Sequence, residues 1–200
     1  MRRTLSALIL ALGLAAPLSV GAASHEVSAM QGGTYALDKQ HASVTARVLH
    51  LGVSYYVVRF NVMDATFTYD PAHPEASSVQ ASVDAASMDV GADYSAKFAD
   101  EFLAATKFPK ITFVSTAIQP GAGNTGTMTG NLTLHGVTKP VTFDVTFDGA
   151  GKSPLPPFRT IVGMTATTKI KRSDFGSDMF QNGIVGDEVT LTIEAEFDKK

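Results

Sequence analysis

The strongest constraint on the fold of this chain is a period of two in its apolar residues. In residues 141–148, Val and Phe alternate with Thr and Asp, and residues 189–198 repeat the pattern with Val, Leu, Ile, Ala and Phe. Successive side chains of a β-strand point to opposite faces, so this period places one row in a core and the other in water. The pattern predicts an all-β protein.

Seven further segments are rich in alternating, β-branched or aromatic residues. They are residues 34–37, 43–50, 55–69, 79–83, 110–119, 128–134 and 162–170. Within 55–69 the apolar positions change from even to odd numbers, which predicts a bulge or bend near residues 61–64. Turn residues such as Asp70-Pro71 and His135-Gly136 separate the segments. We therefore expect roughly eight strands, or nine if 34–37 is counted.

One stretch, residues 94–105, departs from the period of two and is rich in helix-forming residues. Phe98 and Phe102 are four positions apart and therefore share one face of a helix. Pro109 prevents the helix from continuing. This stretch predicts a single short helix across one end of the β structure.

Antiparallel strands with one apolar face close a core either as a sandwich or as a barrel. The chain has neither cysteine nor tryptophan and so lacks the Cys-Trp-Cys core of immunoglobulin-like sandwiches, which favours a barrel. A barrel of about eight strands is wide enough either to be filled by its own side chains or to hold one slim ligand. The strand pattern alone does not choose between these two states.

Residues 1–23 have the features of a secretory signal peptide. A basic start at Arg2 and Arg3 precedes an apolar run over 5–14, and small residues then offer cleavage after Ala22 or Ala23. The uncharged stretch is shorter than the ~20 residues of a membrane-spanning helix. Cleavage removes two arginines and lowers the formal charge from −3 to −5. We expect an exported, acidic single domain over residues 24–200.

Composition and motifs exclude several classes of function. The net negative charge argues against a nucleic-acid-binding protein, and the absence of cysteine excludes disulfides, thiol catalysis and cysteine-based metal sites. No Gly-x-Ser-x-Gly motif is present, and the five histidines lack the paired spacing typical of metal ligands. We predict no enzyme activity, with no catalytic residues, no metal site and no cofactor.

Lys169, Lys171 and Arg172 form the densest basic cluster. We interpret the cluster as a solvated strand end that pairs with Asp174, because surface ion pairs are common and weak. The alternative interpretation is a rim that grips an anionic head group.

Five sequence blocks, in this order, resemble the YceI-like polyisoprenoid-binding family. They are YALDKQHAS at 35–43, KFPKITFVS at 107–115, GNLTLHGVTKPV at 130–141, IKRSDFG at 170–176 and VGDEV at 185–189. The resemblance extends from about residue 35 to residue 197. Two departures are Val58, where a glycine is expected, and Ala96-Lys97-Phe98 at the helix entry, and both are expected to reshape the mouth of a tunnel.

The resemblance implies an extended antiparallel lipocalin-like barrel of about eight strands with one short helix, which holds a long isoprenoid chain in an apolar tunnel. It further implies a periplasmic binding or carrier protein without catalytic residues. The implied partner is an isoprenoid lipid, either a quinone or a polyprenyl phosphate, and a homodimer is an implied assembly because some family members form dimers.

Strand parity and the resemblance together nominate the tunnel residues. The predicted wall residues are Phe113, Leu132, Leu134, Phe143, Val145, Leu191 and Ile193, and the predicted mouth residues are Phe98, Phe102 and Phe108. A register error of one residue would invert a whole strand. The alternative is a barrel filled by its own side chains, acting as a structural, interaction or envelope-stress protein or serving a membrane redox partner.

Overall fold

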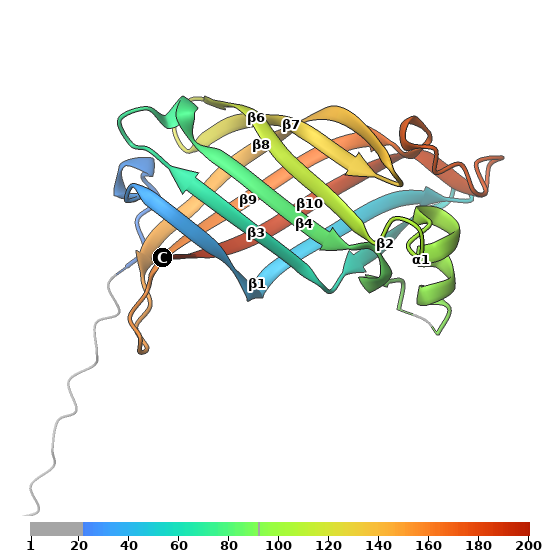
Figure 1. The fold of residues 1–200 in the computed structure, drawn as a ribbon, viewed down its shortest axis with the longest axis horizontal. Coiled ribbons are helices and arrows are strands. Elements are labelled where there is room, and N and C mark those ends of the chain that lie inside the picture. The colour runs from blue at the N-terminus through green and yellow to red at the C-terminus, as the bar shows by residue number, and fades with distance from the viewer. Residues whose placement is uncertain (1–21, 92) are drawn as a thin grey trace, which may run out of the picture.

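The computed structural model describes residues 22–91 and 93–200 and contains ten strands and one α-helix in that part of the chain (Figure 1). The predicted signal peptide, over residues 1–23, lies almost entirely outside the described residues. The elements are β1 (Gly33–His50), β2 (Ser54–Phe60), β3 (Met63–Tyr69), β4 (Ser78–Asp84), β5 (Met88–Asp89), α1 (Ser95–Leu103), β6 (Lys110–Pro120), β7 (Thr125–Leu134), β8 (Val137–Lys152), β9 (Thr160–Lys171) and β10 (Val185–Lys199). Short 3-10 turns include η1 (Val27–Ala29) and η4 (Arg172–Phe175).

Eight strands close into an antiparallel barrel in the order β1-β3-β4-β6-β7-β8-β9-β10, and β10 pairs back onto β1. The register runs from Tyr35 opposite Lys199 to His50 opposite Val185. β2 pairs with the second half of β1, and the two-residue β5 pairs with β2. The prediction of an all-β barrel of about eight strands with one short helix is confirmed.

Two irregularities explain the looser alternation in the first strands. β2 ends at Phe60 and β3 begins at Met63, so the predicted bend near residues 61–64 is confirmed. The register of β1 against β10 shifts between Leu37 and Ala42. Such a shift moves the inward side chains from odd to even positions.

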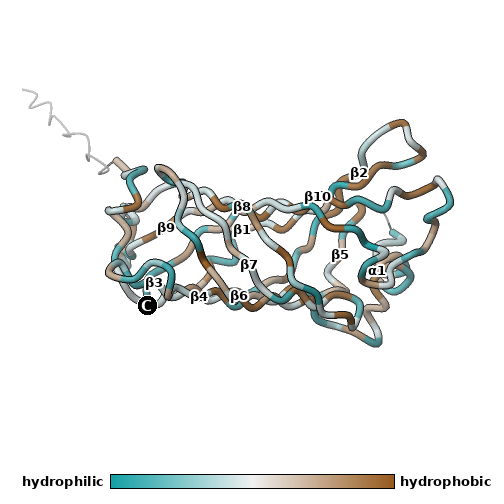
Figure 2. Tube along the Cα trace, turned by 90° about the horizontal axis from the view of Figure 1, so that it is seen from above, coloured by the Kyte–Doolittle hydropathy of each residue, from teal (hydrophilic) through white to brown (hydrophobic). Residues whose placement is uncertain are grey.

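Helix α1 lies across one end of the barrel, beside β2 and β5 (Figures 1 and 2). We call this the helix end, and we call the opposite end, where β1 begins and β10 finishes, the terminal end. No helix in the described ranges, 22–91 and 93–200, is long and apolar enough to cross a membrane.

A packed aromatic cluster occupies the barrel interior at the terminal end. Tyr35 and Val162 are fully buried there, and the ring centroid of Phe67 lies 5.6 Å from that of Tyr35 and 6.0 Å from that of Phe197. Met30, just after η1, packs against the same cluster. Two further clusters of buried apolar residues lie along the barrel and beneath α1.

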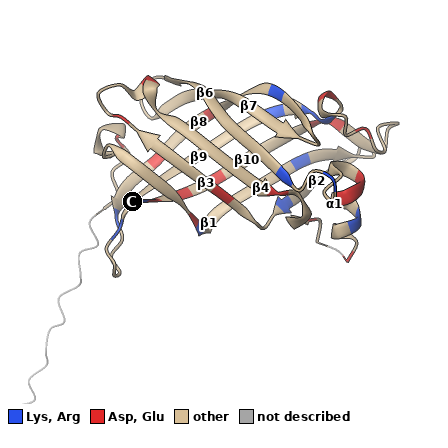
Figure 3. Ribbon diagram, in the orientation of Figure 1, with Lys and Arg blue, Asp and Glu red and all other residues tan. Residues whose placement is uncertain are grey.

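Charge is divided unevenly between the two halves of the barrel (Figure 3). We define the half toward the helix end as residues 44–62, 82–91, 93–113, 130–143 and 166–192, which include α1, β2, β5 and η4 and contain nine basic and nine acidic residues. The other half, toward the terminal end, contains five basic and ten acidic residues. The formal charge of −5 on residues 22–200 therefore belongs to the half at the terminal end.

Candidate functional site

A cavity of about 660 Å³ lies inside the barrel and is lined by side chains from all eight barrel strands, together with β2, β5 and α1. The lining is mostly aliphatic and aromatic. Polar lining residues at the helix end include His50, Tyr56 and Arg172. The volume falls within the roughly 300–1,000 Å³ of small-molecule sites, and an apolar lining with a few polar groups is typical of them.

The cavity exists because small side chains occupy inward positions in the wall. Ala65 on β3 and Ala81 on β4 are register partners, and Phe113 on β6 is the other partner of Ala81. The alanines that line the cavity are Ala42, Ala46, Ala65, Ala81, Ala166 and Ala195. A methyl group at these positions leaves space that a leucine or phenylalanine would fill, so the barrel is not filled by its own side chains.

The structure brings nine of the ten predicted tunnel residues to the cavity. They are Phe98, Phe102, Phe113, Leu132, Leu134, Phe143, Val145, Leu191 and Ile193. Phe108 is not among the lining residues. Its ring centroid lies 5.8 Å from that of His135, and it packs over Gly136, where a Cβ would come within 2.5 Å of the ring. Contact of these residues with a lipid stays a prediction.

Aromatic side chains gather in a row where the cavity meets the helix end. The ring centroid of Phe98 lies 4.8 Å from that of Tyr94 and 5.6 Å from that of Phe102, and Phe102 lies 6.0 Å from Phe180. All four residues line the cavity, and Tyr94 and Phe180 are exposed. Val58, the departure from the family pattern on β2, also lines the cavity. Sequence reasoning missed Tyr94 and Phe180, because neither lies in a strand whose parity could indicate its direction.

Arg172 is a buried cation in the cavity wall, with 5% of its surface exposed. Its Nε donates to the carbonyl of Gly186 at 2.8 Å, Nη1 donates to that of Ser177 at 2.8 Å, and Nη2 donates to that of Val185 at 2.9 Å. Burial lowers the pKa of the guanidinium. The negative charges of Asp187 and Asp178 act in the opposite direction and raise it. These bonds tie η4 to the beginning of β10.

The basic cluster predicted as a solvated strand end is divided. Lys169 fits that interpretation, since its Nζ lies 2.9 Å from Oε1 of Glu188 and both side chains are exposed. Arg172 does not fit the interpretation of a solvated strand end. Its predicted pairing with Asp174 is wrong, because Oδ1 of Asp174 lies 3.7 Å from Nζ of Lys139 instead. The chain leaves β9 at Lys171 and turns into η4, and this turn carries the Arg172 side chain inward.

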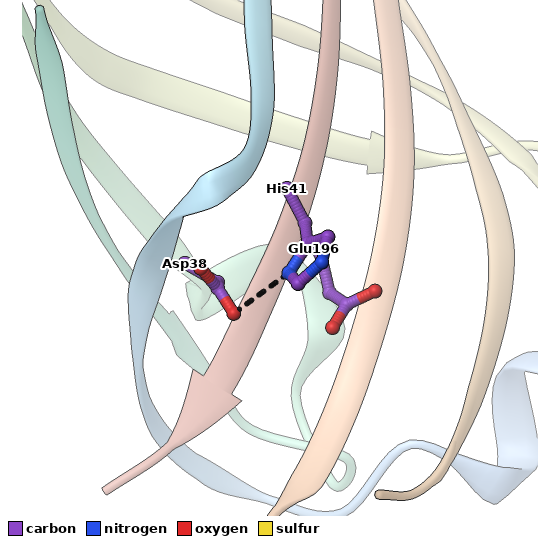
Figure 4. Close-up of side chains that lie close together, drawn as sticks. All are labelled: Asp38, His41 and Glu196. Atoms are coloured by element: carbon purple, nitrogen blue, oxygen red, sulfur yellow. Dashed lines mark hydrogen bonds and ion pairs between the residues drawn. The ribbon is translucent and has the colours of Figure 1, made fainter.

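A second polar grouping, Asp38, His41 and Glu196, lies on the outer surface, toward the terminal end (Figure 4). Nδ1 of His41 lies 3.0 Å from Oδ2 of Asp38, and potential ligand atoms of all three residues lie within 4.8 Å of one another. The register shift in β1 produces this proximity, which the sequence spacing did not indicate. Hydrogen bonding to Asp38 raises the pKa of His41 and lowers that of Asp38. An exposed ion pair accounts for these contacts.

We expect His41 to titrate above its ordinary pKa of 6.5, and its midpoint to fall in the variant Asp38→Asn. The contribution of His41 to stability is present below pH 6.5 and is lost as the pH rises through the raised pKa. The contribution of Asp38 to stability is present above pH 3.8 and is lost as the pH falls through its lowered pKa. NMR titration of the imidazole measures the midpoint. Glu196→Gln should lower it less, and an unchanged midpoint in Asp38→Asn would contradict the assignment.

Comparison with known proteins identifies relatives over most of the chain. The family model described as "YceI-like domain" matches residues 35–197. A UPF0312 protein of Pseudomonas putida strain W619 is 41% identical over 166 residues, which cover 80% of this chain and 85% of that protein. A UPF0312 protein of Pseudomonas fluorescens strain SBW25 is 39% identical over 165 residues, with the same coverage.

Solved structures share the barrel. BcnA of Burkholderia cenocepacia superimposes with a TM-score of 0.71 at 29% identity, over 80% of this chain and 98% of BcnA. A polyisoprenoid binding domain from Saccharophagus degradans gives a TM-score of 0.62 at 14% identity, over 85% of this chain and all of that domain, and this likeness concerns the fold. From the match over residues 35–197 and the identity to the two Pseudomonas proteins, the chain belongs to the YceI-like family.

Proposed function

We propose that this protein is exported to the periplasm, where it binds and carries one isoprenoid lipid, a quinone or a polyprenyl phosphate, inside the barrel. The observation that carries the proposal is the cavity of about 660 Å³ with its mostly apolar lining. An isoprenoid tail gains ~25 cal/mol for each Å² of apolar surface removed from water. Binding of this kind needs no catalytic group.

The distribution of polar groups supports one orientation of the lipid. Uncharged polar residues such as Gln119 and Asn124 line the cavity at the terminal end, beside the aromatic cluster, whereas the cation Arg172 lines it toward the helix end. A guanidinium has five N–H donors, and three hydrogen bonds from Arg172 to backbone carbonyls leave two. Those two donors suit a quinone carbonyl or a phosphate oxygen, so the tail points toward the terminal end and the head toward the helix end.

Family membership and fold support the same role. The domain of Saccharophagus degradans with this barrel is a polyisoprenoid binding domain by its own description, which makes the fold one that hosts such binding. Export is supported by the basic, apolar and small-residue regions of residues 1–23.

Native mass spectrometry of the protein, produced from its full-length sequence and isolated from the periplasm without detergent, tests the proposal. We expect a one-to-one adduct that extracts into organic solvent as an isoprenoid. The mass of the protein itself reports whether cleavage follows Ala22 or Ala23. A bare protein that takes up neither an added long-chain isoprenoid quinone nor undecaprenyl phosphate would overturn the carrier function.

A further inference from the structure

The hairpin between β1 and β2 carries apolar side chains that the barrel does not bury. Leu51 is 56% exposed and Val53 is 85% exposed, and Tyr55 and Val57 on the outer face of β2 are also exposed. We call these four residues the apolar tip. Figure 2 shows the hairpin projecting from the helix end with hydrophobic residues in its turn. A contiguous exposed group of this kind marks an interaction site, unlike single exposed apolar residues.

The apolar tip is continuous with the rim of the cavity. The backbone N–H of Leu51 donates to the carbonyl of Ile184 at 2.8 Å, so the tip lies against the loop that leads into β10. Ile184 and Phe180 in that loop are exposed, and Phe180 lines the cavity. His50, which precedes the tip in sequence, and Tyr56, which lies between Tyr55 and Val57, line the cavity as well. A surface that covers the tip therefore also meets the cavity rim.

Local backbone geometry does not explain the leucine in this turn. Leu51 has a φ of 54° and Gly52 has a φ of 69°. Asn, Asp or Gly suit positive φ, whereas a bulky side chain is disfavoured there. Leu51 thus goes against the backbone preference of its position and gains little burial within the barrel. An apolar partner outside the chain would give Leu51 the burial that the barrel does not.

Cationic side chains lie beside Tyr55 and Val57, the part of the apolar tip farther from its turn, on the outer face of the barrel. The guanidinium of Arg47 lies 3.3 Å from the ring centroid of Tyr55. Arg47 and Lys169 flank the same residue of β10, since each is a register partner of Thr190, and Lys169 also pairs with Glu188 on this face. Apolar residues followed by tyrosine, arginine and lysine match the layers of a membrane interface, where long cationic side chains reach the phosphates.

The charge of the whole barrel favours the same orientation. The half toward the helix end is formally neutral, and the half toward the terminal end carries −5 (Figure 3). An anionic bilayer repels the acidic half, so the helix end faces the surface on approach.

From these observations we infer that the helix end docks on an anionic lipid bilayer. Leu51 and Val53, at the turn of the apolar tip, insert among the acyl chains, while Arg47 and Lys169 lie at the level of the phosphates. The inference rests on the proposed function, because a carrier of a membrane lipid has to receive it from a bilayer. It adds the surface through which the lipid reaches the cavity.

The absence of tryptophan from the chain allows a clean test. In the variant Val53→Trp, we expect the fluorescence to shift to shorter wavelength on addition of vesicles of phosphatidylcholine and phosphatidylglycerol, and to be quenched by brominated lipids. The matched control is Leu155→Trp, on the β8–β9 hairpin in the acidic half, where Leu155 is 69% exposed. This control should show neither effect.

A second pair of variants measures the energetic role of the tip. Leu51→Ser combined with Val53→Ser should weaken partitioning onto the same vesicles by about tenfold or more, because two exposed apolar side chains are lost. Leu155→Ser should leave partitioning unchanged. Bilayer docking would be overturned if Val53→Trp showed no shift or if Leu155→Trp showed an equal one. It would also be overturned if the shift followed protein concentration without vesicles, and that result would identify a second copy as the partner.

The two proposals fail separately. Uptake of an isoprenoid quinone added in solution is measured by native mass spectrometry and does not require a bilayer. Uptake by the wild-type protein together with a silent Val53→Trp would overturn docking alone. Vesicle binding through the tip without any isoprenoid uptake would leave docking supported and overturn the carrier function.

Discussion

The double substitution of Ala46→Phe and Ala81→Phe is expected to reduce isoprenoid uptake by at least about tenfold while the barrel remains folded. Ala46 on β1 and Ala81 on β4 line the cavity, and the two phenyl rings would occupy the space that a lipid tail needs. Because the rings enter existing space rather than a packed region, the midpoint of thermal unfolding should not fall.

Quinone uptake measured by native mass spectrometry, together with thermal unfolding followed by circular dichroism, checks this prediction. The matched control is Ala117→Phe on β6, which adds the same ring at an exposed position outside the cavity lining. The control should bind as the wild type does. A folded double variant with wild-type uptake would show that the lipid does not bind in the cavity.

The largest loss of stability is expected from Arg172→Met. The substitution leaves the carbonyls of Ser177, Val185 and Gly186 without their donor, and unpaired buried groups of this kind together cost about 3 kcal/mol. Urea unfolding measures the change in free energy. Arg172→Lys retains the charge but not the planar set of donors. Its free energy of unfolding should lie between those of the wild type and Arg172→Met.

The neighbouring variant Lys171→Met is the control, because Lys171 is exposed and precedes η4. It should change the free energy of unfolding by less than about 0.5 kcal/mol. If Arg172→Met lost no more than Lys171→Met, the three hydrogen bonds would not be stabilising the connection between η4 and β10.

Much of the barrel was predictable because inward and outward side chains alternate along every regular strand. Strand parity assigned Leu132 and Leu134 on β7 and Leu191 and Ile193 on β10 to the interior, and all four line the cavity. The bend between β2 and β3 was predictable for the same reason, since Phe60 and Met63 differ in parity.

The cavity itself was harder to predict, because it arises from missing volume. The pattern identifies Ala81 or Ala166 as inward residues, but only the closed barrel brings small side chains from separate strands to one space. Arg172 and Phe180 lie where regular strands have ended, so parity gave no direction for either side chain. Phe108 also lies outside a strand, just before β6, so parity gave no direction for its side chain either.

The pairing of β1 with β10 has a consequence for how the protein folds. These are the first and last strands of the chain, and their register joins Tyr35 to Lys199. Contacts so distant in sequence require a large loss of chain entropy before they form, and proteins dominated by them fold slowly. The barrel closes only once its final strand is available, so a ribosome-bound chain that lacks this strand has no enclosed cavity to offer a ligand.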